Sequence, residues 1–149
     1  MLLKAKPMVP LFDNLTVVSP TTGSLLYPTD IDMVFDFKKA LLVVEFKHGT
    51  TPLTEGQRIL LERMTNRFGI LVIPVVAEVH LVNPDGTFDA AQTIVRSVYA
   101  GKTFGWIDLS QLMLPLGHVF NTMVAVFSDA ETKTPKADEV IRRILGGIE

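Results

Sequence analysis

Two short apolar runs joined by a polar turn constrain the fold of this chain more than any other feature. The runs cover residues 30–36 and 41–47, and the turn covers residues 37–40. Such runs are typical of strands, and so short a connection predicts an antiparallel hairpin. Residues 54–66 then repeat apolar side chains at helical spacing, and residues 70–77 form a continuous apolar run. This order of hairpin, helix and strand predicts an α/β fold with a central mixed sheet flanked by helices.

The length of 149 residues fits one domain with its own hydrophobic core. We expect this domain to span residues 1–149, with a core over about 25–82 and a C-terminal extension over about 88–149. The pattern of the extension predicts a helix over 90–99, a loop over 101–106, a strand over 123–127 and a final amphipathic helix over 136–145.

Composition excludes several classes of site. The chain has no cysteine, so disulfides, thiolate zinc sites and cysteine nucleophiles are excluded.

Mean hydropathy is +0.33, yet no apolar run reaches the roughly 18 residues that cross a bilayer, and residues 1–7 are too short for a secretory signal. We therefore expect a cytoplasmic protein without a membrane partner. The net charge of −2 lacks the basic excess of proteins held to nucleic acid by bulk charge, so DNA binding would need a local basic patch.

The hairpin carries charges where an apolar strand would not need them. Side chains alternate across a strand, so Glu45 and Lys47 share one face and lie about 7 Å apart along it. In a tight hairpin, Asp32 lies close to Glu45 across the strand pair, and two carboxylates placed in this way can share a hard cation. The alternative is an exposed strand face decorated by an ion pair.

The pattern of Asp32, Glu45 and Lys47 resembles the motif of the PD-(D/E)XK nuclease superfamily, which includes Holliday junction resolvases and restriction endonucleases. Asp32 is followed after twelve residues by Glu45-Phe46-Lys47. The helix that follows carries Gln57 in its first turns, which is similar to the element that often follows the Glu-x-Lys strand in that group. The resemblance covers about the middle third of the chain and implies a restriction endonuclease-like core.

The resemblance also implies a metal-dependent phosphodiester hydrolase, an endonuclease acting on DNA, with a resolvase-like enzyme as the narrower expectation. Asp32 and Glu45 then serve as ligands of Mg²⁺ or Mn²⁺, and Lys47 lies near the scissile phosphate and the attacking water. Gln57 either hydrogen-bonds the phosphate or holds Lys47 in place. Such enzymes commonly work as homodimers, often in phages and mobile elements, and the apolar residues 109–127 are a candidate interface.

The chain departs from the family pattern in its first acidic motif. No glutamate precedes Glu45, so either Asp13 substitutes for it or the site uses fewer ligands. Asp30 and Asp32 share a strand face; we favour Asp32, because the apolar run begins directly after it. His48 is a further candidate for contact with metal or phosphate.

Two matters stay open at this point. One is whether a basic rim contacts the DNA backbone, or whether its residues belong only to an exposed turn and a solvated helix face. The residues of this rim are Lys38, Lys39, Arg58, Arg63 and Arg67. The other is function: a non-catalytic module with a nuclease-like core and a structural or protein-binding role is the alternative, and RNA is an alternative substrate.

Overall fold

A computed structural model of the chain describes residues 31–67, 71–127 and 135–146, together with the backbone of three short strands nearer the N-terminus. Those strands pair antiparallel, two with each other and one with a strand from the middle of the chain. They are β2 (Val17–Val18) with β3 (Leu25–Leu26), and β1 (Leu2–Lys4) with β7 (Thr87–Asp89). The candidate site residues Asp13 and Asp30 lie outside the described residues.

Five strands form the central sheet, in the order β4-β5-β6-β8-β9. They are β4 (Met33–Asp36), β5 (Ala40–His48), β6 (Leu71–Val79), β8 (Ile94–Tyr99) and β9 (Trp106–Asp108). β5 and β6 are parallel, and the other neighbours are antiparallel. The sheet is therefore mixed, and the predicted α/β class with a mixed central sheet is confirmed.

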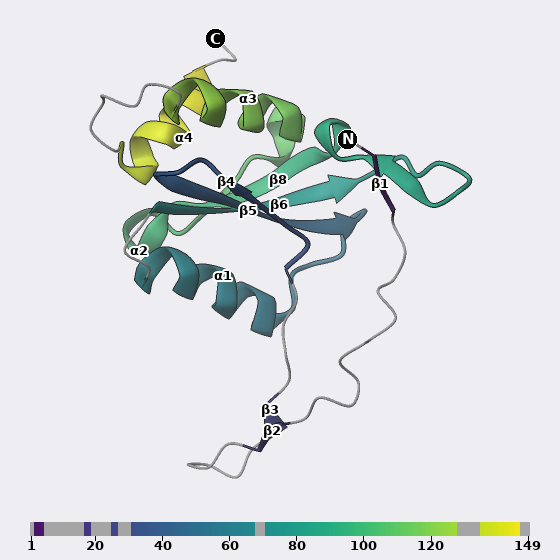
Figure 1. Ribbon diagram of the computed structural model, residues 1–149, viewed down its shortest axis with the longest axis horizontal. Coiled ribbons are helices and arrows are strands. Elements are labelled where there is room, and N and C mark those ends of the chain that lie inside the picture. Colours follow the sequence, from purple (N-terminus) through teal and green to yellow (C-terminus); the bar gives the residue numbers. More distant parts are fainter. Residues whose placement is uncertain are drawn as a thin grey trace.

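Helices cover both faces of this sheet (Figure 1). The connection between the two parallel strands contains α1 (Glu55–Arg67), which lies against one face. The other face is covered by α3 (Leu116–Phe127) and α4 (Ala137–Gly146). The short α2 (Gly101–Phe104) contacts α1, and two 3₁₀ turns cover Ala90–Gln92 and Ser110–Leu112.

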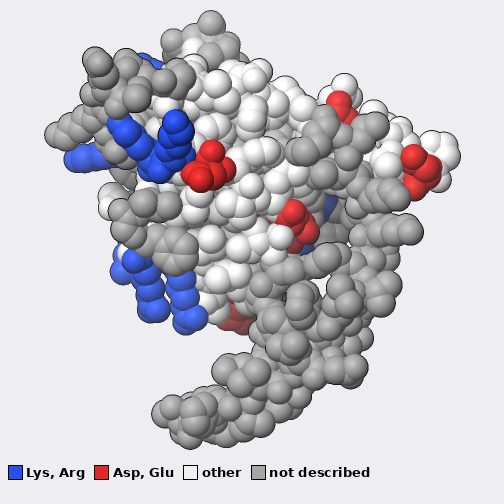
Figure 2. All heavy atoms as spheres, viewed as in Figure 1, with Lys and Arg blue, Asp and Glu red and all other residues white. Residues whose placement is uncertain are grey.

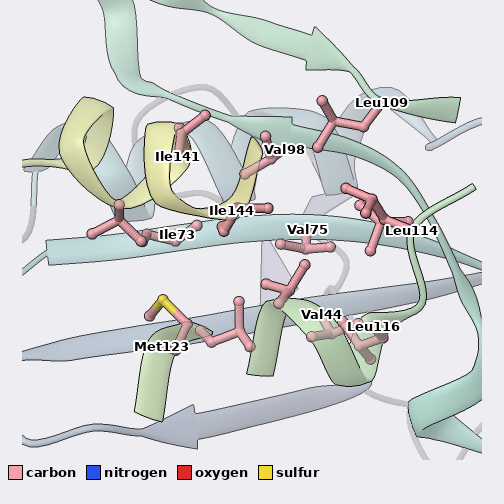
Figure 3. Packing of buried hydrophobic residues seen from close by; sticks show 14 of the residues in the cluster. Val44, Ile73, Val75, Val98, Leu109, Leu114, Leu116, Met123, Ile141 and Ile144 are labelled. Carbon is pink, nitrogen blue, oxygen red and sulfur yellow. The ribbon is translucent and has the colours of Figure 1, made fainter. Parts of the chain in front are cut away.

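Alternation along β5 divides its side chains between two hydrophobic clusters. Leu42 and Val44 point to the face covered by α3 and α4, where the larger cluster forms. Figure 3 shows Met123 and Leu116 of α3 and Ile141 and Ile144 of α4 among the strand residues of this cluster. On the opposite face Val43 packs with Val72 of β6 and with Leu61 and Met64 of α1. The residues of β5 that share a face with Val43 therefore point towards α1.

Four predicted elements agree with the structure. The hairpin is formed by β4 and β5, with Met33 opposite Val44 and the turn at residues 37–39. The first helix is α1, and the final helix is α4, with Val140, Ile141 and Ile144 buried. Residues 71–79 form one strand in spite of Pro74, because the ladder with β8 starts at Val75, one residue beyond the proline.

Three predictions for the C-terminal part are wrong. Residues 94–99 form strand β8 rather than a helix, and residues 123–127 belong to helix α3 rather than to a strand. The expected loop at 101–106 contains α2 and the start of β9. In addition, β8 and β9 extend the same sheet, so the sheet continues well beyond residue 82, into the region expected to be an extension.

The apolar region 109–127 packs largely inside its own chain. Leu116, Val119, Met123 and Val126 of α3 are all buried in the larger cluster. Exposed large apolar side chains remain at Leu112, Met113 and Val124. Among the described helices, none is long and apolar enough to cross a membrane.

Candidate active site

The charged pair at the end of β5 lies beneath the first turn of α1. Glu45 and Lys47 share a face with Val43, and the Glu45 Oε1 atom lies 3.3 Å from the Lys47 Nζ atom. The two side chains are only 7% and 12% exposed. Removing a carboxylate and an ammonium from water is costly unless each finds a partner, and here each is a charged partner of the other. The structure thus agrees with the predicted side of the strand for both residues.

Gln57 of α1 connects the two charges. Its Nε2 donates to Glu45 Oε1 at 2.5 Å, and its Oε1 accepts from Lys47 Nζ at 2.7 Å. The three side chains therefore form a closed ring of contacts. Of the two roles open for Gln57, holding Lys47 in place matches these contacts.

The start of α1 fixes where Gln57 lies. Thr54 Oγ1 accepts from the Gln57 backbone N–H at 3.2 Å, and Gln57 Oε1 accepts from the Thr54 backbone N–H at 3.1 Å. This reciprocal pair is a capping box, in which Thr54 satisfies a free N–H of the first turn. Because Gln57 Oε1 contacts both Thr54 and Lys47, the helix cap and the site share one oxygen atom.

Asp32 reaches the same end of the hairpin from β4. The ladder pairs Met33 with Val44, so the register continued by one residue sets Asp32 opposite Glu45. The Phe46 backbone N–H donates to Asp32 Oδ2 at 2.7 Å. This bond fixes the Asp32 carboxylate against the strand that carries Glu45 and Lys47. The predicted closeness of Asp32 and Glu45 across the hairpin is thus consistent with the register.

The structure does not bring the proposed basic residues together at this site. Lys38 and Lys39 occupy the β4–β5 turn, and from Ala40 to Lys47 the strand spans about 23 Å at about 3.3 Å per residue. Arg58 follows Gln57 but donates twice to Glu62, at 2.9 and 3.0 Å, one turn further along α1. Arg63 is exposed in the second half of α1, and His48 is exposed directly after Lys47.

Basic side chains gather instead at the opposite end of the sheet. In Figure 2 Lys and Arg concentrate at the left edge, where Figure 1 shows the β4–β5 turn and the end of α1. Exposed residues of the elements that meet there include Lys38, Arg63, Arg67 and Lys102. Several Asp and Glu residues appear further to the right in Figure 2. Charge is thus distributed unevenly along the strand direction.

Glu78 and Arg96 lie beside the site, and neither was predicted from the sequence to belong to it. Glu78 of β6 is the register partner of Lys47, and its Oε1 accepts from Arg96 Nε at 2.7 Å. Arg96 also donates to the backbone carbonyls of Gly49 and Thr51, in the loop between β5 and α1. Each is a charged residue inside an otherwise apolar strand, and this pattern could have indicated a site residue. The pattern is not visible at Arg96 when residues 90–99 are predicted to be helical.

The donor set fits a hard divalent cation with few protein ligands. Within the described parts of the chain, no group of three or more His, Cys, Asp or Glu side chains is placed to hold a metal. Asp32 and Glu45 supply two carboxylates, and Mg²⁺ commonly uses one or two carboxylates with waters and phosphate oxygens. Comparisons with protein-family models, with curated proteins and with solved structures found no match to this chain, and the function is therefore inferred from these residues.

Proposed function

We propose that this chain is a metal-dependent phosphodiester hydrolase, an endonuclease acting on DNA with a core of the PD-(D/E)XK type. One observation carries the proposal. The buried Glu45 meets Lys47 and Gln57, while the carboxylate of Asp32 is fixed to the neighbouring residue Phe46. The strand order β4-β5-β6-β8-β9, with a helical crossover between β5 and β6, supports it as the scaffold of such a site.

In this proposal each residue has a chemical task. Asp32 and Glu45 hold Mg²⁺ or Mn²⁺, which when bound activates water and neutralises charge at a phosphate. Lys47 adds a positive charge beside the phosphate, where charge develops during hydrolysis. Gln57 keeps the Lys47 ammonium oriented, and α1 keeps Gln57 in place through the capping box.

The partners belong to the proposal as well. DNA is the substrate, and its backbone contacts Lys38, Lys39, Arg58 and Arg63. Lys38 and Arg63 are exposed, which such contacts require. A homodimer would let two sites meet two strands of a duplex. Exposed Leu112, Met113 and Val124 within the region 109–127 are the side chains left for that interface.

The test combines metal binding with cleavage. Mg²⁺ and Mn²⁺ are titrated calorimetrically into the wild type, Glu45→Ala, Glu45→Gln and the control Glu139→Ala, which removes an exposed carboxylate of α4. The same proteins are assayed for nicking of supercoiled, branched and single-stranded DNA. We expect the wild type and Glu139→Ala to bind metal and nick DNA, and both Glu45 variants to lose both properties. Preference for branched DNA would identify a resolvase-like enzyme.

A non-catalytic role is the second candidate. The observation in its favour is that Glu45, Lys47 and Gln57 already satisfy one another without any ligand. A folded wild type that binds neither metal nor DNA would overturn the nuclease proposal in favour of a structural or protein-binding module. Cleavage of RNA but not of DNA would keep the hydrolase and change its substrate.

A further inference from the structure

Arg96 lies at an irregularity of the sheet beside the candidate site. The register between β6 and β8 pairs Val76 with Ser97 and then Ala77 with Val95, so Arg96 is the extra residue of a β-bulge. Val95 and Val98 both belong to the larger cluster, although strict alternation would place residues three apart on opposite faces. The bulge restores the inward positions of both valines and turns Arg96 towards the face that carries Lys47 and Glu78.

The Arg96 guanidinium joins the end of β6 to the loop that follows β5. Its Nε donates to Glu78 Oε1 at 2.7 Å, its Nη1 donates to the Thr51 carbonyl at 2.5 Å, and its Nη2 donates to the Gly49 carbonyl. The side chain is 19% exposed, and that of Glu78 is 17% exposed. A planar guanidinium presents its donors in a rigid fork, which suits three acceptors at fixed positions better than an ammonium does.

The loop held in this way connects two members of the site. It follows Lys47 and His48 at the end of β5 and leads to Thr54 and Gln57 at the start of α1. Gly49 has a φ of +54°, and the Thr51 N–H donates to the His48 carbonyl at 3.2 Å, so the chain turns tightly there. The position of Gln57 relative to Lys47 therefore depends on how this loop is fixed.

We propose that Arg96 is a positioning residue for the candidate site. Together with Glu78 it fixes the loop at Gly49 and Thr51, and so sets the contact between Lys47 and Gln57. The inference rests on the proposed function for its kinetic consequence, but its structural consequence can be measured without any activity.

The first experiment reads the geometry of Gln57 directly. The side-chain amide signal of Gln57 is identified in ¹H–¹⁵N spectra by its loss in Gln57→Glu. We expect Arg96→Met to shift this signal towards that of a solvated glutamine. Arg96→Lys should shift it partly, because one ammonium cannot reach all three acceptors in the same geometry. The control Arg142→Met, which removes an exposed arginine of α4 paired with Asp138, should leave the signal unchanged.

The second experiment uses nicking kinetics and a double-mutant cycle. We expect Arg96→Met to lower kcat about tenfold, while KM stays within about twofold. Losses of this size are typical of residues that orient the groups of a site without contacting the substrate themselves. In the double variant with Gln57→Leu, the fold-reduction of kcat should be smaller than the product of the two single reductions, because both substitutions disrupt the same contact. Losses that multiply fully would indicate a general effect on the fold and overturn the positioning role.

The two proposals fail in different ways. An unshifted Gln57 signal in folded Arg96→Met overturns the role of Arg96, whatever the nicking assay shows. A shifted signal in a protein whose wild type never cleaves nucleic acid keeps the positioning role and overturns the nuclease. If Arg96→Met does not fold, Arg96→Lys alone carries the test, and an unshifted Gln57 signal in folded Arg96→Lys would likewise overturn the proposal.

Discussion

At the scale of single residues, the candidate site is a nearly buried ion pair with a glutamine bridging the two charges. Glu45 is 5% exposed, and its carboxylate is compensated by Lys47 and Gln57. When one partner of a buried ion pair is removed, the other charge is left uncompensated, at a cost of about 3–5 kcal/mol. The proposed metal site predicts that stability and metal binding are coupled, because a cation near Glu45 would take over part of the role of Lys47.

Replacing Lys47 by methionine should show this coupling. In EDTA we expect Lys47→Met to lower the free energy of unfolding by about 3 kcal/mol, since Glu45 loses its ammonium partner. Magnesium should restore part of the loss, because a ligand that binds only the folded state stabilises it. Urea unfolding with and without Mg²⁺ measures both effects. The control Lys102→Met removes an exposed lysine of α2 and should show neither. A Lys47→Met protein as stable as the wild type in EDTA would contradict the coupling.

Two exposed aspartates should make stability depend on acid pH. The Ser110 hydroxyl and then its backbone N–H lower the pKa of Asp108 below 3.8, and Thr87 lowers the pKa of Asp85 in the same way. A carboxyl group whose pKa falls on folding stabilises the protein above its unfolded pKa, and that contribution disappears as the pH falls through the folded pKa. We therefore expect Asp108→Asn to destabilise the protein at neutral pH and to differ less from the wild type below pH 3.8. Urea unfolding at several pH values measures this, and a difference that is constant with pH would argue against it.

At the scale of elements, each helix is tied to the sheet by specific side chains. For α1 polar contacts add to the apolar packing of Leu61 and Met64: Gln57 hydrogen-bonds to residues of β5, and Trp106 Nε1 donates to Glu62 Oε1 at 2.9 Å. For α3 the contacts are apolar, because the residues buried along it recur at helical spacing at Leu116, Val119, Met123 and Val126. Changes in α1 are therefore expected to affect the site, and changes in α3 to affect stability alone.

The α1 cap gives a prediction that joins stability to function. Thr54→Ala should lower the free energy of unfolding by about 1 kcal/mol, because a free N–H of the first turn loses its acceptor. It should also lower the nicking rate, since the same capping box orients Gln57. Thermal unfolding and the nicking assay measure the two effects. Thr50→Ala, in the exposed loop before α1, serves as the control, and an equal loss in both variants would argue against the cap.

The α3 helix offers a matched pair of neighbouring residues. Met123 is fully buried, whereas Val124 is 45% exposed. Met123→Ala leaves a cavity under the sheet and should cost about 2–5 kcal/mol, while Val124→Ala should cost far less. Urea unfolding measures both free energies. Similar small effects would mean that α3 does not pack on the sheet as described.

At the scale of the whole molecule, the proposed site lies at one end of the sheet. Exposed basic residues gather at the other end, around the β4–β5 turn (Figure 2). About 23 Å of β5 separates the turn from Lys47. A duplex that contacts both ends must therefore extend along the protein over several base pairs. Contacts to phosphates fix where DNA lies without reading its sequence.

Charge reversal at the turn tests this arrangement. Lys38→Glu should weaken binding of a duplex and reduce the slope of log K against log salt by about 1, because one phosphate contact is lost. Lys136→Glu makes the same change of charge just before α4 and should have a smaller effect. Fluorescence anisotropy at several salt concentrations measures both slopes. Equal slopes in the two variants would mean that only net charge matters.

The sequence by itself determined the hairpin, α1 and α4, because in these segments local spacing and turn chemistry agree with the final packing. It also placed Glu45 and Lys47 on one face and Asp32 across the hairpin, since strand alternation needs no knowledge of the rest of the molecule. The metal, the substrate and the role of Lys47 stay predictions, which the metal-binding and nicking experiments test.

Only the tertiary structure decided what residues 94–99 and 116–127 become. Val95 and Val98 are spaced as on a helix, yet both face inward because the bulge at Arg96 inserts one residue. The apolar residues at the end of α3 resemble a strand over a short window, but packing under the sheet selects the helical spacing of the whole segment. The contacts of Arg96 with Gly49 and Thr51 join residues more than forty positions apart, and such contacts are fixed only when the strands assemble.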